Sequence, residues 1–178
     1  MKPKAPHGLT EAAGTTLAEL LMVIALVGLV AGWAFGVQPE SVARQQVETA
    51  MRRLVVALER GRTAAERSGS PCALELGTWG WRGAQAEGAV PCPGADTSLD
   101  EGLLAGELLL SHTFSGPLRF STNGLAIDGG TALVGAVGTD LVRCLVVSPP
   151  LGVMRVGRYA GAITARPQAS ACQPDAAL

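Results

Sequence analysis

The stretch Gly14–Leu21, with the sequence GTTLAELL, decides the fold of this 178-residue chain. It places one carboxylate, Glu19, directly before residues 20–37, which carry no charge and are mostly Leu, Val, Ala, Ile, Met, Trp and Phe. At about 1.5 Å of rise per residue, these 18 residues predict a helix of about 27 Å, enough to cross the hydrocarbon core of a bilayer. A glutamate at the N-terminal end of such a helix is costly in lipid, so Glu19 is a candidate functional residue.

The N-terminal residues also carry a processing signal. A short leader with Lys2 and Lys4, then Gly14, then an apolar helix with Glu19 as the fifth residue after that glycine closely resembles the type IV prepilin signal. The resemblance implies that a prepilin peptidase cuts after Gly14 and methylates the new amine of Thr15, and that Glu19 is needed for assembly. It also implies a single-pass protein of the bacterial inner membrane, with a cytoplasmic N-terminus and a periplasmic C-terminal domain.

Two alternatives to the prepilin signal also fit an apolar N-terminal segment. A secretory signal has an apolar core of about 7–15 residues followed by a small-residue cleavage site. In this chain the apolar run is longer and the small residue, Gly14, precedes it. The second alternative is a plain membrane anchor of a periplasmic protein that never assembles, in which Glu19 is an incidental interfacial charge.

The four cysteines predict a disulfide-bonded domain. All of them follow the apolar segment, and in a periplasmic domain an even number predicts two disulfides with three possible connectivities. We favour Cys72–Cys92 and Cys144–Cys172, which close loops of about 20 and 28 residues. A zinc site is the alternative, but the chain has no CxxC pair and its two histidines lie far from the cysteines. We therefore expect no metal and no other cofactor.

Three parts are expected: a leader peptide (1–14), which the prepilin resemblance implies, and then a long N-terminal helix (15–68) and a β-rich domain (69–178), which the hydrophobic pattern predicts. The helix is expected to be transmembrane at about 20–37 and amphipathic at about 42–68, where apolar residues recur at three- and four-residue spacing. Glu48 and Arg52 are expected to pair on its surface. The predicted fold class is α+β, with a long N-terminal α-helix, membrane-spanning in its first half, packed on an antiparallel β-sheet domain.

Short apolar or alternating runs after Pro71 predict the strands of this domain, and Gly- and Pro-rich stretches predict its turns. The expected strands are residues 72–78, 117–121, 131–137, 141–147 and 153–156. Residues 84–100 indicate a loop, residues 103–110 a strand or short helix, and the tail from Pro167 an irregular segment held by Cys172.

The β-rich domain contains a second family pattern. The segment 118–124 (LRFSTNG), followed by 143–148 (RCLVVS) and 152–158 (GVMRVGR), is similar to the β-domain of the GspH/FimT family of minor pilins and pseudopilins. The resemblance covers about 40 residues. It implies a long helix packed against two antiparallel sheets.

The residues do not indicate an enzyme. Ser111 and His112 are neighbours in sequence, which does not make a triad, and no nucleophile-elbow motif is present. We expect a structural minor pilin or pseudopilin of a type IV pilus or a type II secretion system, with other pilins, the prepilin peptidase and the inner membrane as its partners. The sequence does not separate the two systems.

DNA contact is the runner-up function, in a minor pilin for DNA uptake. Some GspH/FimT-type minor pilins bind DNA through a Gly-Arg-x-Arg loop, and this chain keeps the first arginine of that pattern, Arg158, without the second. Arg155 and Arg166 are the other candidate contacts, and Tyr159 is a candidate for stacking on a base.

Overall fold

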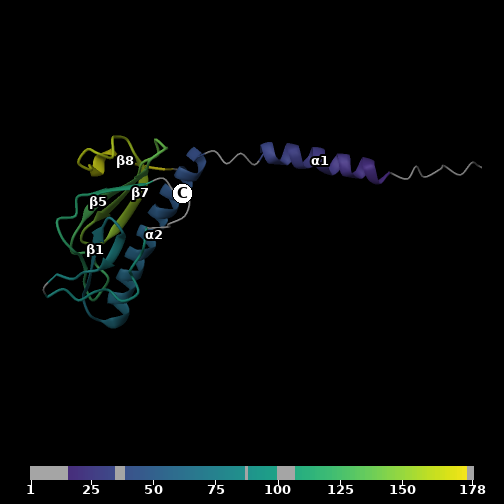
Figure 1. The fold of residues 1–178 in the computed structure, drawn as a ribbon. Coiled ribbons are helices and arrows are strands. Elements are labelled where there is room, and N and C mark those ends of the chain that lie inside the picture. The colour runs from purple at the N-terminus through teal and green to yellow at the C-terminus, as the bar shows by residue number, and fades with distance from the viewer. Residues whose placement is uncertain (1–15, 35–38, 87, 100–106, 176–178) are drawn as a thin grey trace, which may run out of the picture. The chain divides into compact units, whose positions relative to one another are not determined.

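The computed structural model describes residues 16–34, 39–86, 88–99 and 107–175. The chain divides into two units, residues 1–37 and 38–178, and each is considered by itself. The described residues form an α+β structure with two α-helices and two antiparallel sheets (Figure 1).

The prediction of one long N-terminal helix is wrong. Helix α1 spans Leu17–Ala34, and a separate helix, α2, spans Pro39–Ser68. Pro39 explains where α2 begins, because a proline lacks the N–H that a helix interior needs but is well tolerated in the first turn, where that N–H has no partner. The prediction of a membrane-spanning first half is also overturned: no helix within the described residues has the length and apolar character that crossing a bilayer requires.

Helix α2 is amphipathic over its whole length. Its buried residues follow a spacing of three and four: Ala43, Val47, Ala50, Met51, Leu54, Ala57, Leu58, Gly61 and Ala65. Gly61 permits a close approach to the sheet, because a Cβ there would lie 2.8 Å from Leu74 Cδ1 and 3.1 Å from Phe120 Cε2. The helix ends at Ser68, as the sequence SGSP predicts, and Gly69 follows with φ +59°.

The two sheets lie against α2. The smaller has the order β2-β1-β4, and the larger has the order β3-β5-β6-β7-β8. The strands of the smaller sheet are β1 (Cys72–Gly77), β2 (Gly80–Gly83) and β4 (Leu118–Phe120). Those of the larger sheet are β3 (Leu108–His112), β5 (Gly130–Ala136), β6 (Arg143–Ser148), β7 (Val153–Tyr159) and β8 (Cys172–Pro174).

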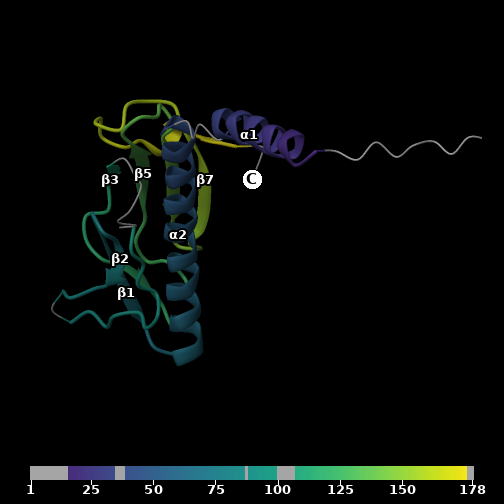
Figure 2. The ribbon, with the colours of Figure 1, turned by 45° about the vertical axis from the view of Figure 1, so that its right-hand side comes forward.

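Alternation along the strands gives the larger sheet two buried faces. One face, which includes Val134, Leu145 and Val147, packs on α2 and shares its core with the smaller sheet. Figure 2 shows α2 running alongside the sheet, with β5 and β7 on either side of the helix in that view. The opposite face carries a second, smaller cluster that includes Leu133, Val146 and the disulfide of β6. Unit 38–178 therefore has a complete core of its own.

The structure contains two strands that the sequence did not predict. Strand β2 reads GWRG, with no apolar alternation, and is formed by its pairing with β1. Strand β8 lies in the tail that we predicted to be irregular, and it pairs with β7 from Gly157 to Tyr159. A short 3-10 turn, Ala169–Ala171, precedes β8.

Candidate functional site

The first turn of α1 contains the candidate assembly residue. Thr16 lies directly before the helix, and its Oγ1 accepts a hydrogen bond of 3.3 Å from the backbone N–H of Glu19. A threonine followed three residues later by glutamate is the capping-box pattern, which satisfies free N–H groups at a helix start. Sequence reasoning missed this local role, although the spacing of Thr16 and Glu19 was visible. The Glu19 carboxylate also lies near the positive end of the helix dipole, which favours it by about 0.3–1 kcal/mol.

Apart from Glu19, residues 17–30 of α1 form an apolar surface that is exposed in the single chain. Ten large apolar side chains between Leu17 and Val30 are 55–77% exposed in the single chain, and they point in all directions around the helix axis. Glu19 is the one charged residue of α1. The predicted cleavage residues, Gly14 and Thr15, lie outside the described residues.

The cysteines are joined as the sequence favoured. Cys72 at the start of β1 is bonded to Cys92, and their Cα atoms are 4.9 Å apart. Cys144 of β6 is bonded to Cys172 of β8 with a Cα separation of 5.8 Å. The first disulfide ties the loop of residues 84–99 to the smaller sheet, and the second ties the C-terminal strand to the larger one.

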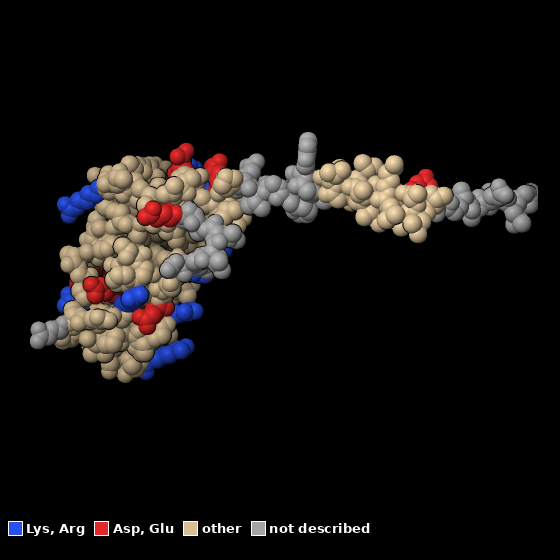
Figure 3. Space-filling model, viewed as in Figure 1, with Lys and Arg blue, Asp and Glu red and all other residues tan. Residues whose placement is uncertain are grey.

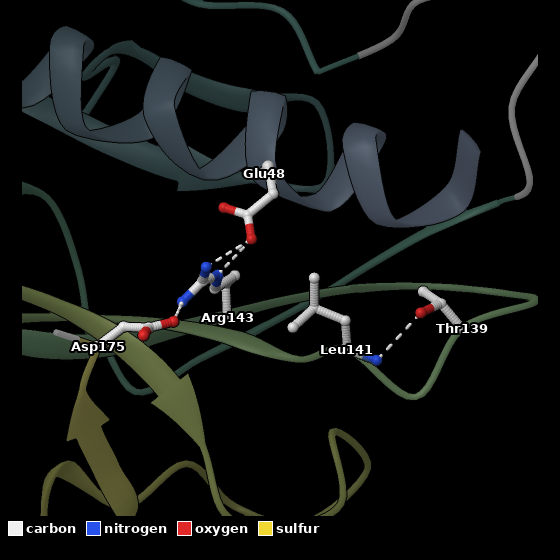
Figure 4. A network of polar contacts seen from close by, with 5 residues as sticks. All are labelled: Glu48, Thr139, Leu141, Arg143 and Asp175. Carbon is white, nitrogen blue, oxygen red and sulfur yellow. Dashed lines mark hydrogen bonds and ion pairs between the residues drawn. The ribbon is translucent and has the colours of Figure 1, made fainter. Parts of the chain in front are cut away.

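An ion network around the buried Arg143 links α2, β6 and the C-terminal tail (Figure 4). The guanidinium of Arg143 donates to Glu48 Oε1 from Nε (2.8 Å) and Nη2 (2.5 Å), and to Asp175 Oδ2 from Nη1 (2.6 Å). Burial alone would lower the pKa of Arg143, but the hydrogen bonds that it donates to Glu48 and Asp175 outweigh burial, and the pKa is raised. The predicted Glu48–Arg52 pair does not occur among the contacts of the described residues, because the Glu48 carboxylate is turned to Arg143.

A second arginine–carboxylate pair holds the turn between β4 and β5. Arg119 donates to both oxygens of Asp128, from Nε at 2.7 Å and from Nη2 at 2.8 Å, and its backbone N–H adds a bond of 3.1 Å. The hydrogen bond from the Arg119 side chain lowers the pKa of Asp128 despite partial burial. The same turn contains Gly124, with φ +70°, where a Cβ would collide with the side chain of Glu66 on α2.

The structure does not bring the candidate DNA contacts together. In the β6–β7 register, Arg158 is opposite Arg143 and Arg155 is opposite Val146, so the two arginines project from opposite faces of the sheet. Arg155 donates to the carbonyl of Ala169 at 2.7 Å, and Arg166 lies in the loop after β7.

The candidate stacking residue is not available either. Tyr159 is buried, and its hydroxyl oxygen accepts a bond of 3.1 Å from the backbone N–H of Gln168. The prediction that Tyr159 stacks on a base is therefore wrong.

Two further observations bear on chemistry. Ser111 and His112 are consecutive residues of β3, so their side chains leave opposite faces of that strand. The described residues contain no group of three or more His, Cys, Asp or Glu side chains placed to hold a metal ion.

No protein-family model, curated protein or solved structure matches this chain.

Proposed function

We propose that this chain is a pilin-like structural subunit, a minor pilin or pseudopilin, that is cut after Gly14 and joins a filament through its N-terminal helix. The observation that carries the proposal is the surface of α1, which is apolar on every side and bears one carboxylate, Glu19, in its first turn. Exposed apolar area of this extent marks a surface that another apolar partner covers. The N-terminal helices of neighbouring pilins are the partners that the prepilin-like sequence implies.

The carboxylate has a defined part in this proposal. Covering α1 would remove Glu19 from water, and an unpaired buried carboxylate costs several kcal/mol. The methylated amine of Thr15 on a neighbouring subunit is the cation that would pair with it. Apolar packing then supplies adhesion, and the ion pair selects the axial register.

The disulfides support export of the folded domain. Two closed cysteine pairs are typical of proteins that fold in an oxidising compartment. We propose that the N-terminal segment attaches the chain to the bacterial inner membrane and that unit 38–178 lies in the periplasm. A type IV pilus and a type II secretion pseudopilus are both compatible with this arrangement.

The test is processing followed by assembly, in cells with an active prepilin peptidase. Mass spectrometry should find methylated Thr15 as the N-terminus of the extracted protein. An intact Met1 terminus in those cells would contradict the assignment.

Assembly is tested with Glu19→Ala, which should leave cleavage intact and sharply reduce the protein found in sheared filaments. Thr16→Ala is the matched control, because it removes the helix cap and keeps the carboxylate. If Thr16→Ala impairs assembly as strongly as Glu19→Ala, then assembly depends on an intact start of α1 and not on the carboxylate, and the ion-pair role is refuted.

A further inference from the structure

Three shallow hollows adjoin one another where α2 meets the loop of residues 93–98. The largest, of about 750 Å³, and the next, of about 580 Å³, share Val56 and Arg60 in their walls. The third, of about 380 Å³, shares residues 96–98 with the second. We name this continuous surface the α2 groove. None of the candidate DNA contacts predicted from the sequence lines it.

The α2 groove is basic. Arg52, Arg60 and Arg67 follow one exposed side of α2 and line it, and none of the three has an ion pair or hydrogen bond with another side chain among the described residues. Arginines project at the edge that α2 occupies in this view of the domain (Figure 3). At about 1.5 Å per residue, Arg52 lies about 12 Å from Arg60 along the axis, and Arg67 about 10 Å further on.

Acidic groups offset this charge only in part. Glu59 and Asp96 also line the groove, and Asp96 Oδ1 accepts a bond of 2.8 Å from the backbone N–H of Gly83. With Arg82 included, four arginines face these two carboxylates among the described residues. These residues give the groove a net positive charge of about two over about 22 Å of helix.

One end of the α2 groove carries an aromatic group. Arg82 lines the third hollow, and its guanidinium carbon lies 4.4 Å from the centroid of the Trp79 ring, which is 42% exposed. The floor of the groove is apolar where Val55, Val56 and Pro93 line it. Unpaired bases can stack on a flat cation–aromatic pair and pack on an apolar floor. The bases of a duplex are stacked inside it, so a duplex would offer this surface only its phosphates.

We propose that the α2 groove binds single-stranded nucleic acid, with the arginines of α2 on its phosphates and the Trp79–Arg82 pair stacking on a base. Arginine suits this ligand because its planar fork matches phosphate oxygens. An acidic polypeptide matches the charge of the groove but leaves the Trp79–Arg82 pair and the apolar floor without a counterpart. This function goes beyond the structural role proposed above, and it does not depend on the N-terminal helix.

The test uses a fragment of residues 39–178 with both disulfides intact, since this unit has its own core. Binding of a fluorescent twelve-residue oligothymidylate is followed by anisotropy at low salt. We expect micromolar binding that weakens with salt, with a log–log slope of about −2 to −3 for three or four phosphate contacts on a single strand. The fragment lacks Trp33 and Trp81 is fully buried, so quenching of tryptophan fluorescence reports on Trp79.

The variants separate the groove from general charge. Arg60→Glu should weaken binding at least tenfold, and Arg60→Lys should keep most of it. Arg158→Glu changes the net charge by the same amount on a different surface and should leave binding unchanged. Trp79→Ala should weaken binding about fivefold or more and leave the salt slope unchanged. Far-ultraviolet circular dichroism should show that each variant is folded.

Several results would overturn the proposal. These are no binding at 100 µM fragment and low salt, an equal loss in Arg60→Glu and Arg158→Glu, or tighter binding of a twelve-base-pair duplex. Binding of poly-glutamate as tight as that of the oligonucleotide, with tryptophan fluorescence unchanged, would assign the groove to an acidic polypeptide instead. Because the fragment lacks Gly14 and Glu19, none of these results bears on the proposed assembly.

Discussion

Replacing Arg143 with methionine should strongly destabilise unit 38–178. The side chain of Arg143 is 9% exposed and donates three charge-assisted hydrogen bonds, two to Glu48 and one to Asp175. Methionine keeps most of the volume but leaves both carboxylates without a cation. Removing one partner of a fully buried ion pair costs about 3–5 kcal/mol. Glu48 and Asp175 are 30% and 33% exposed, so water recovers part of that loss and we expect about 2–3 kcal/mol.

The assay is urea unfolding of a fragment of residues 39–178 with its disulfides oxidised. The expected change corresponds to a fall in Tm of about 6–10 °C for a domain of this size. Arg119→Met is the matched control, because Arg119 makes a similar two-point contact with Asp128 but its side chain is 57% exposed. The control should lose clearly less stability, since exposed pairs contribute little. Equal losses of unfolding free energy in the two variants would refute the argument that burial makes the Arg143 network more stabilising than an exposed pair.

Three more perturbations test the fold. Gly157→Ala should destabilise the domain by a few kcal/mol and release β8, because a Cβ there would collide with the backbone of Gln173; unchanged amide-exchange protection of β8 would contradict this. Cys144→Ser with Cys172→Ser should lower the free energy of unfolding by about 3 kcal/mol, and a loss below about 1 kcal/mol would show that the tail is held by strand pairing alone. The lowered pKa of Asp128 means that its pair with Arg119 contributes stability above the unfolded pKa of about 4 and loses it as the pH falls through the folded value. Asp128→Asn should therefore flatten the dependence of unfolding free energy on pH below about pH 4, and an unchanged slope there would refute the stated cause of the shift.

Local patterns predicted much of unit 38–178. The three- and four-residue spacing from Val47 to Ala65 identified the buried face of α2. The apolar residues of an amphipathic helix form one stripe, and that stripe faces the core. Alternating runs located β5, β6 and β7 to within a few residues for the same reason. Proximity along the chain favoured the disulfides that the structure contains.

The features that sequence missed are those formed by distant partners. Glu48 and Arg143 are 95 residues apart, so a neighbouring arginine, Arg52, was the only partner that the helix pattern suggested. Strand β2 acquires its conformation from β1, and β8 acquires its own from β7 and Cys172. The second wall of the α2 groove is a loop that lies 25 or more residues beyond α2, and the spacing of residues on the helix carries no information about that loop.

Glu19 has a local explanation and a proposed assembly role, and their magnitudes decide between them. The helix dipole favours a carboxylate in the first turn by about 0.3–1 kcal/mol, without any partner. That gain is enough while Glu19 is exposed to water, as it is in the single chain. It is too small to hold a charge among covered apolar side chains, where an unpaired carboxylate costs several kcal/mol. If α1 is covered in a filament, as we propose, the helix dipole cannot be the whole reason for Glu19: the carboxylate must either take up a proton or pair with a cation, and the methylated amine of a neighbouring chain is the cation that the proposal supplies.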